Sequence, residues 1–424
     1  MTIRLVTRLG YLLFSVLLFG CAEAPPRHVS SPPKVSLGAE QIIFEEEANA
    51  AGAIMDPVGK THILVRSAQR PYNIHYIVVS HEGIVERSNL GPMVESGGRK
   101  RIDMVFDRNG GLHALVGDPD HWTKTDSTHL MLAEGKWQKL SDSCEGLVEN
   151  DPDITCYFAP KPEDVKAPRH WEWLIFYGAV GGFGIPFYVK TDKLVLASAM
   201  NTAFPWAVVD IDTKLVVVQP VAVADANGNV YLAYKCEVAL PNWQAKYAVT
   251  RSPAADAAQG NASAYEKVLR VNGNWIGGDL KYVKPSLTPN AGAEGAFLLL
   301  SSTYPPSGLK LGDSLRLRLF RLDPQTAAQL PDLPLGLYDA KFATGGKDRM
   351  HFLAQEAVEH WMYGTEPSDS IVYFELTGST YSGFANLGTG IPVAIVSDNN
   401  GRALAIWQKL PGKQLVMRWI EPQD

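Results

Sequence analysis

Cysteine is scarce in this sequence: the 424 residues include only Cys21, Cys144, Cys156 and Cys236. No Cys-x-x-Cys pair and no tight Cys/His cluster occurs, which argues against a structural zinc site. So few cysteines also argue against a fold held by several disulfides. Cys144 and Cys156 flank a short segment, and in an oxidising compartment we expect a bridge between them, worth about 3 kcal/mol.

Clusters of positive charge and complete catalytic motifs are absent as well. The chain has 39 basic and 45 acidic residues, a net charge of −6, and no Lys/Arg-rich run, so we expect no nucleic-acid partner. No Gly-x-Ser-x-Gly nucleophile elbow is present. The glycine-rich segment 181–184 leads into a strand without a following Gly-Lys-Ser/Thr, so it predicts a hairpin turn and not a phosphate loop.

One apolar run stands out, and it lies at the N-terminus. Leu9 to Phe19 is too short to span a bilayer and follows Arg4 and Arg8, a pattern typical of a signal peptide over residues 1–20. Residues 18–21, Leu-Phe-Gly-Cys, resemble a bacterial lipobox. The resemblance implies cleavage before Cys21, a diacylglycerol on its sulfur and acylation of its new amine; several acyl chains anchor a protein stably. In such lipoproteins Ala22 implies the outer membrane. An ordinary secretory signal with a coincidental cysteine is the alternative.

The remaining chain divides into a tether and one folded domain. Residues 21–38 are rich in Pro and Ser and predict an extended tether. Residues 39–424 contain no second long apolar run and no long stretch with helical periodicity, and their β-rich runs are punctuated by Gly. We expect this domain to be all-β.

A short phrase recurs three times in that domain: Asp107–Gly110, Asp225–Gly228 and Asp398–Gly401. Apolar runs flank each copy, and Asn-Gly favours the two-residue type I′ hairpin. Weaker copies begin at Asp56 and Gly345, and spacing suggests further corners near positions 164 and 290. Repetition at this period predicts a single β-propeller, most simply with seven four-stranded blades; six or eight follow if one weak copy is wrong. The segment around Glu40 to Phe44 is expected to pair with the last strand and so cover its edge.

The phrase Asp-x-x-Gly followed by an apolar strand resembles the repeats of bacterial sialidase-like propeller proteins over most of residues 40–424. No copy matches the full sialidase box, Ser/Thr-x-Asp-x-Gly-x-Thr-Trp. The resemblance therefore supports the architecture and transfers no catalytic residue.

Two sets of polar residues accompany the corners. Asp107, Asp225 and Asp398 could ligate calcium, but a carboxylate that accepts backbone N–H groups within its own turn accounts for all three copies. Histidines stand at equivalent positions near four corners, where they suggest either an axial metal site or imidazoles packed between blades, the interpretation we favour. These histidines are His62, His113, His170 and His351.

Loops at the opposite ends of the strands carry more varied chemistry. Asp118, Asp120 and Asp126 are weak candidates for a divalent cation such as Ca²⁺; a solvated acidic loop is the alternative. Aromatic faces interspersed with charged groups suit sugars or extended peptides. The candidate ligand-binding residues are Arg66, Arg70, Tyr72, Asp120, His121, Trp122, Trp243, Tyr304 and His360.

Two functions fit these features. The first is a lipid-anchored binding or scaffold module, not an enzyme, that holds an envelope protein or glycan on its loops. The second is a polysaccharide hydrolase, with Asp120 and Glu356 as its carboxylate pair, or a lyase that uses His121 and Arg66. No convergence of catalytic groups is visible in the sequence, which favours the binding module.

Overall fold

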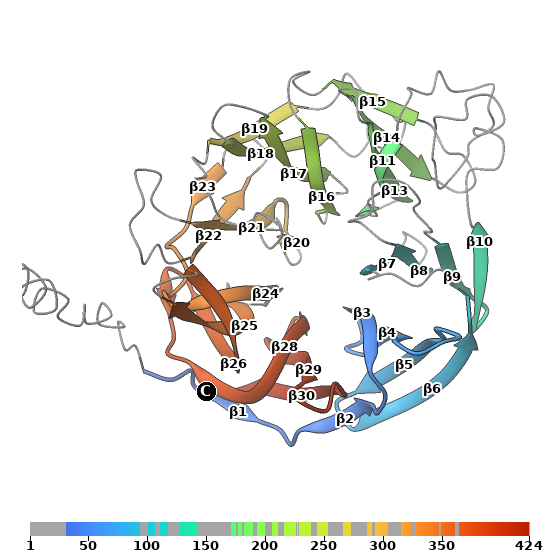
Figure 1. Ribbon diagram of the computed structural model, residues 1–424, viewed down its shortest axis with the longest axis vertical. Helices are drawn as coiled ribbons and strands as arrows, with labels where there is room; N and C mark the ends of the chain where they lie inside the picture. The colour runs from blue at the N-terminus through green and yellow to red at the C-terminus, as the bar shows by residue number, and fades with distance from the viewer. Residues whose placement is uncertain are drawn as a thin grey trace, which may run out of the picture. The chain divides into compact units, whose positions relative to one another are not determined.

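The computed structural model consists of strands in the parts of the chain that it describes (Figure 1). No helix that could cross a bilayer occurs in those parts. The described residues are 31–93, 101–106, 111–117, 128–141, 171–174, 177–179, 182–189, 193–199, 206–210, 216–225, 227, 229–238, 244–252, 266–272, 286–290, 293–303, 315–323, 327–346, 349–360 and 364–423.

The strands form antiparallel sheets in which neighbours along the chain are mostly neighbours in the sheet. The first two sheets are β3 (Ala48–Met55), β4 (Thr61–Ser67), β5 (Ile74–Ser80) and β6 (Gly83–Gly91), then β7 (Arg101–Phe106), β8 (Leu112–Gly117), β9 (Thr128–Ala133) and β10 (Lys136–Ser141). The third comprises β11 (Trp171–Leu174), β12 (Tyr177–Ala179), β13 (Gly182–Val189), β14 (Lys193–Ala199) and β15 (Trp206–Asp210). The fourth and fifth are β16 (Val216–Ala224), β17 (Val230–Val238), β18 (Gln244–Ser252) and β19 (Glu266–Asn272), then β20 (Ser286–Pro289), β21 (Ala296–Thr303), β22 (Leu315–Leu322) and β23 (Ala327–Gln329).

The last sheet contains two such meanders joined by one shared strand. Its members are β24 (Leu337–Gly345), β25 (Arg349–His360), β26 (Gly364–Thr377), β27 (Thr380–Tyr381), β28 (Ala385–Ser397), β29 (Ala403–Lys409), β30 (Leu415–Pro422), β1 (Val35–Leu37) and β2 (Gln41–Phe44). The first part of β28 pairs with β26 and the remainder pairs with β29, so the chain passes between the meanders without a loop. Gly390 lies at this passage because a Cβ there would be 2.2 Å from the Gln408 carbonyl oxygen.

The first strands of successive sheets contact one another. The contacts run from β3 to β7, β12, β16, β20, β24 and β28, and β28 in turn contacts β3. Antiparallel meanders that meet face to face through their first strands have the architecture of a β-propeller.

Apolar side chains on both faces of each sheet hold neighbouring sheets together. In β4, Ile63 packs toward Leu404 of β29, whereas Leu64 packs toward Ile102 of β7. Successive residues of a strand point to opposite faces, so a strand between two sheets must be apolar on both. Ile63 and Leu64 are fully buried, and each contributes about 1.5–3 kcal/mol to stability.

The N-terminal strands complete the last meander, as predicted. Both β1 and β2 pair antiparallel with β30, Leu37 with Ile420 and Gln41 with Met417, and they lie beside it in Figure 1. The pairing covers the outer edge of β30. It begins at Val35, inside residues 21–38, so part of the predicted tether belongs to the sheet.

Two predictions about corners are wrong. The corners at Asp56 and Asp398 are not two-residue type I′ hairpins. At Asp398, the N–H of Gly401 donates to the Asp398 carbonyl, and the N–H of Asp398 donates to the Arg402 carbonyl. Of the residues in this turn, Gly401 alone has a positive φ, 82°. This is a three-residue loop with one left-handed glycine, in which the asparagine stays right-handed. The corner near position 164 is also misplaced, because β11 and β12 come first in their sheet and Ala179 pairs with Gly182.

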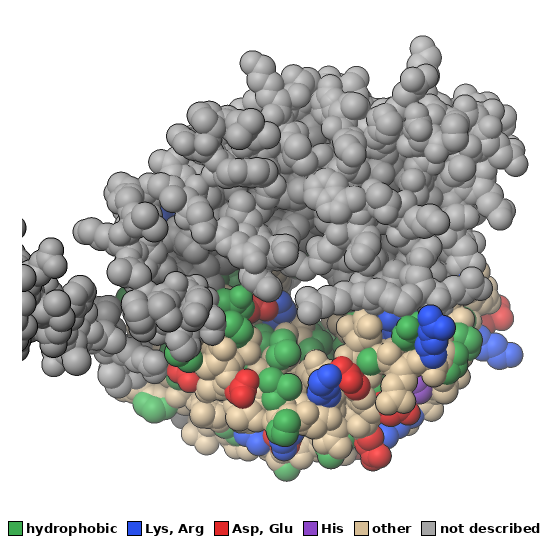
Figure 2. Space-filling view, in the orientation of Figure 1, with side chains coloured by type: hydrophobic (Ala, Val, Ile, Leu, Met, Phe, Trp, Pro, Cys, Tyr) green, Lys and Arg blue, Asp and Glu red, His purple; other side chains and the backbone are tan. Residues whose placement is uncertain are grey.

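The ends of the sheets define two faces. The turn face carries the corners 56–60 and 398–402; the loop face carries the connections 68–73 and 410–414 at the other ends of the strands. Figure 2 shows the described side chains of this view with basic and acidic groups interspersed.

Candidate functional site

The corner aspartates on the turn face are occupied by N–H donors. The Oδ1 atoms of Asp56, Asp225 and Asp398 each accept two backbone N–H groups, from the residues two and four positions later, at 2.8–3.0 Å. Three copies of one geometry support the turn-forming interpretation over a calcium site.

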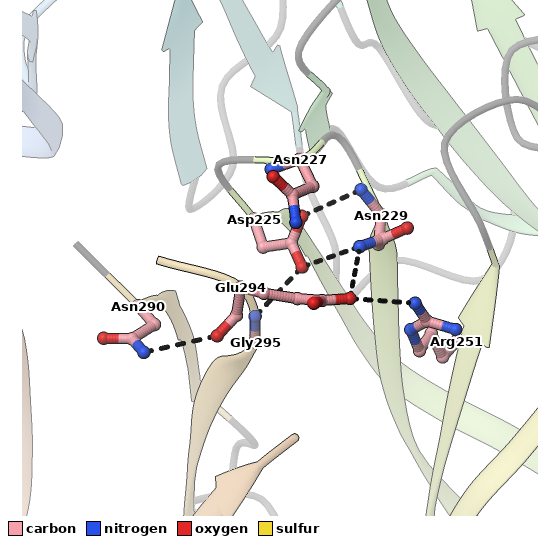
Figure 3. A network of polar contacts seen from close by, with 7 residues as sticks. All are labelled: Asp225, Asn227, Asn229, Arg251, Asn290, Glu294 and Gly295. Atoms are coloured by element: carbon pink, nitrogen blue, oxygen red, sulfur yellow. Dashed lines mark hydrogen bonds and ion pairs between the residues drawn. The ribbon is translucent and has the colours of Figure 1, made fainter. Parts of the chain in front are cut away.

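Asp225 also links two sheets (Figure 3). Its Oδ2 accepts the N–H of Gly295, from the corner of the next sheet, at 2.9 Å, and the side-chain amide of Asn229 at 3.0 Å. Glu294 accepts from Asn229 at 3.2 Å and from Arg251 at 3.2 Å. Because Arg251 and these amides supply donors to both carboxylates, the network joins the two sheets.

The corner histidines pack against tyrosines from the adjacent strand. His62 Nδ1 lies 2.6 Å from the Tyr76 hydroxyl, and its Nε2 lies 3.3 Å from Asp56 Oδ2. His351 Nδ1 lies 2.7 Å from the hydroxyl of Tyr373, which donates to Glu375 at 2.6 Å. These pairs support imidazoles packed within and between sheets. No group of three potential metal-ligating side chains is found among the described residues.

His351 is neutral in this surrounding. The Tyr373 hydroxyl donates its hydrogen bond to Glu375, so its oxygen accepts the Nδ1–H of His351, and Nε2 of the neutral imidazole carries no proton. That atom is fully buried and has no hydrogen-bond partner in the described structure. Burial, with the charge of Arg349 as a second cause, lowers the pKa of His351 to about 4.

The loop face contains the candidate functional site. Of the nine predicted ligand-binding residues, the structure describes the side chains of Arg66, Arg70 and Tyr72. Asp120, His121, Trp122, Trp243 and Tyr304 lie outside the described residues, as do Asp118, Asp126 and the cysteines Cys21, Cys144 and Cys156. The backbone of His360 pairs with Gly364 at the end of β25; its side chain is outside the description.

The three described residues come together around one tyrosine ring. The guanidinium carbon of Arg66 lies 4.3 Å from the centre of the Tyr72 ring, and that of Arg70 lies 5.9 Å from it. Arg70 Nε donates to the Tyr72 hydroxyl at 3.4 Å. Cation–π contact of this kind contributes about 0.5–2 kcal/mol each. The cluster comprises one buried cation, one exposed cation and a half-buried ring between them.

The backbone of the loop fixes the position of Tyr72. Tyr72 has a φ of 60°, a left-handed conformation that is costly for a residue with a side chain. Its N–H donates to the Gln69 carbonyl at 2.7 Å, and the N–H of Ala68 donates to the Glu47 carbonyl beside the start of β3 at 2.8 Å. The loop therefore holds Tyr72 and Arg70 near the first strand of its sheet.

Arg70 is the free cation of the cluster. Tyr72 is the one side chain in the described parts that bonds to its guanidinium, and no described carboxylate pairs with it. That hydrogen bond raises the pKa of Arg70. Arg66 lies below the ring, where burial lowers its pKa. An anion that reaches Arg70 would meet a donor that no acid of the described residues neutralises.

Arg66 occupies a repeated position. Gln408 lies ten residues after Asp398, as Arg66 lies ten after Asp56, and Gln355 lies four after His351, as Arg66 lies four after His62. Gln408 Nε2 donates to the carbonyl of Ala48 at 3.1 Å, and Gln355 Nε2 donates to that of Gly390 at 3.3 Å. In both cases the amide reaches the first strand of the next meander, β3 for Gln408 and β28 for Gln355. We call this position the clasp; in the sheet of β3 to β6 it is Arg66.

The neighbouring loop presents a second cation in a similar way. Lys413 has a φ of 57° and its Nζ pairs with Glu47 at 2.6 Å. Glu47 thus contacts both loops, through its carbonyl and its carboxylate. Lys413, Gln355 and Gln408 were not predicted from the sequence. The two glutamines lie ten residues after the first corner position, Gly345 or Asp398, and this spacing is the signal that could have identified them.

No protein-family model matches this sequence, and no curated protein matches it. Among solved structures, the chain is similar to the β-propeller domain of Cps50 (Swd1) from Myceliophteria thermophila, with 10% identity and a TM-score of 0.49 over 91% of this chain and 99% of that one. It is also similar to an ulvan lyase, with 10% identity and a TM-score of 0.46 over 92% of this chain and 94% of that one. An α-L-arabinanase from Penicillium chrysogenum has 12% identity and a TM-score of 0.42 over 94% of this chain and 99% of that one. These similarities carry no argument about function, and the propeller architecture follows from the strand contacts above.

Proposed function

We propose that this protein is a lipid-anchored binding module of the outer membrane, and not an enzyme, whose loop face holds an anionic group of an envelope glycan or protein. Cys21 is the proposed lipidation site, after a signal peptide over residues 1–20. The folded domain is proposed to have seven blades, since seven first strands follow one another in contact: β3, β7, β12, β16, β20, β24 and β28.

One observation carries the binding proposal: an exposed Arg70 without a carboxylate partner in the described structure, held beside the Tyr72 ring by a strained loop. Backbone strain of this kind costs about 1–3 kcal/mol and clusters at functional sites. Arg66 under the ring keeps the tyrosine in place and adds positive potential. A guanidinium binds a carboxylate through two parallel hydrogen bonds, and the ring supplies an apolar surface beside it.

The full lipoprotein in detergent tests this proposal. Retention on immobilised polygalacturonate and on immobilised poly-L-glutamate should exceed retention on a neutral polysaccharide, and the stronger of the two identifies the ligand as a glycan or a protein. Arg70→Ala should weaken the stronger interaction by about tenfold or more, the loss of one charged hydrogen-bonded contact of 1.5–3 kcal/mol. The matched control is Lys60→Ala, which removes an exposed cation from the turn face.

Equal losses for Arg70→Ala and Lys60→Ala would refute the site, because net charge alone would then explain retention. Cleavage of the polygalacturonate during the experiment would support the alternative, a polysaccharide hydrolase or lyase. That alternative relies on Asp120 and His121, which lie outside the described residues.

A further inference from the structure

The path of residues 35–44 along β30 shows at which face the described chain begins. Val35 pairs with Pro422 and Gln41 pairs with Met417, so the segment runs antiparallel to β30. Strand β30 follows the loop 410–414 and therefore runs from the loop face to the turn face. The N-terminal segment consequently begins at the turn face and ends at the loop face, where β3 starts.

Two hydrogen bonds fix the beginning of this segment at the turn face. The N–H of Gln423 donates to the Lys34 carbonyl at 2.8 Å, and the N–H of Gly383 donates to the Ser31 carbonyl at 2.7 Å. Gln423 follows the end of β30, and Gly383 follows β27, which pairs with β26 across the turn 378–379. Two separate parts of the sheet thus hold residues 31–34 at the same end.

The Arg66–Tyr72 cluster lies at the opposite end of the strands. Arg66 is in the last part of β4, next to the loop 68–73. Strand β30 has eight residues, so at 3.2–3.4 Å per residue the two faces are separated by about 25 Å along it.

We propose that the turn face is the membrane-facing surface of this protein and that the loop face is presented to the aqueous compartment. The inference rests on the lipid anchor of the proposed function. Ser31 follows Cys21 by ten positions, a span that reaches about 35 Å when fully extended. To place the loop face on the bilayer, this tether would have to return along the sheet for about 25 Å, more than two thirds of its extended reach.

The orientation narrows the ligand class. A loop face that points away from the bilayer cannot bind lipid headgroups of the membrane in which the protein is anchored. The anion that Arg70 receives therefore belongs to a macromolecule in the aqueous compartment, and not to a phospholipid.

A fluorescent amino acid placed at Val58 or at Gln69 of the acylated full chain tests the orientation. Val58, on the turn face, is 79% exposed, and Gln69, on the loop face, is exposed as well. In vesicles of neutral lipid with a nitroxide-labelled headgroup lipid, emission at position 58 should be lost to a greater extent than emission at position 69. Equal loss at both positions, or a greater loss at 69, overturns the proposed orientation.

The Cys21→Ser chain, which cannot be acylated, separates the two proposals. If the acylated chain associates with the vesicles no better than Cys21→Ser, the anchor fails and the orientation fails with it. If Cys21→Ser binds vesicles of anionic phospholipid and Arg70→Ala abolishes that binding, the anchor can stand, but the aqueous ligand is refuted.

Discussion

Asp225→Ala is expected to destabilise the fold more than the same change at the other corner aspartates. Asp225 is 2% exposed and accepts four hydrogen bonds, one of them from Gly295 of the next sheet. Its removal leaves buried N–H groups without an acceptor, at about 1–3 kcal/mol each. With partial relaxation of the turn, we expect a loss of about 4 kcal/mol in the free energy of unfolding.

Asp398→Ala is the matched comparison. Asp398 accepts the same two backbone N–H groups, but its third donor is Arg402 of its own turn and the N–H of Asn400 is exposed to water. Water can replace these bonds, so we expect a loss of about 1–2 kcal/mol. The difference between the two variants measures the contribution of the contact between sheets.

Asp225→Asn separates the turn from that contact. The amide oxygen can still accept the two turn N–H groups, whereas the amide nitrogen faces the N–H of Gly295 and cannot accept from it. We expect an intermediate loss of about 2 kcal/mol. Guanidinium unfolding, followed together by far-UV circular dichroism and tryptophan fluorescence, provides the measurement. Equal losses for Asp225→Ala and Asp398→Ala would refute the assignment of Asp225 as a link between sheets.

Three further predictions address other parts of the fold. The pKa of His351 in the folded chain, about 4, lies below its ordinary value of 6.5, so between these values the unfolded chain binds a proton that the folded chain excludes. The stability from this group should be complete above pH 6.5 and decrease as the pH falls toward 4. In denaturation curves His351→Gln should flatten this decrease, whereas His81→Gln, at an exposed site, should not. Gly390→Ala should lower the thermal midpoint far more than Gly401→Ala, because its Cβ would meet the Gln408 carbonyl whereas Gly401 has open space and loses about 1 kcal/mol through its positive φ. Ile43→Ala, in the N-terminal strand that covers β30, should lower the free energy of unfolding by about 2–5 kcal/mol. The neighbouring Ile42→Ala, at a side chain 42% exposed, should change it by less than about 0.5 kcal/mol. Similar losses for the two variants would contradict the packing of β2.

Much of the sheet arrangement was predictable because it follows from local signals. Corner glycines and alternating apolar runs predicted the strands around Asp56, Asp225 and Asp398, and the edge of the last strand predicted its pairing with residues 41–44. The type I′ turn was wrong because Asn-Gly also fits a three-residue loop with only the glycine left-handed. The third sheet was misplaced because the corner at Asp164 was inferred from spacing alone, without a glycine among residues 164–168 to support it.

The site was harder to predict, since it depends on contacts between loops. Arg66, Arg70 and Tyr72 were selected for their residue types, but the sequence did not indicate that two guanidinium groups surround one ring. Their arrangement requires the left-handed backbone at Tyr72 and the hydrogen bond from Ala68 to Glu47. Neither residue type nor spacing predicts a positive φ at a tyrosine, because most positions of this kind are glycine or asparagine.

The turn face and the loop face differ in how closely their side-chain contacts repeat from sheet to sheet. This difference indicates at which face a specific ligand would bind. At the turn face, Asp56, Asp225 and Asp398 form the same hydrogen bonds, as expected where each sheet meets its neighbour in one way. At the loop face, the clasp position is Gln355 in one meander of the last sheet and Gln408 in the other, each reaching a backbone carbonyl. Arg66 replaces that neutral amide with a buried charge under an aromatic ring. Burial of a charge is costly, and a glutamine already makes the link between sheets, so the sheet contact alone does not account for an arginine. A requirement for positive potential beneath Tyr72 does account for it, and it places the departure from the repeat at the residues proposed to bind the ligand.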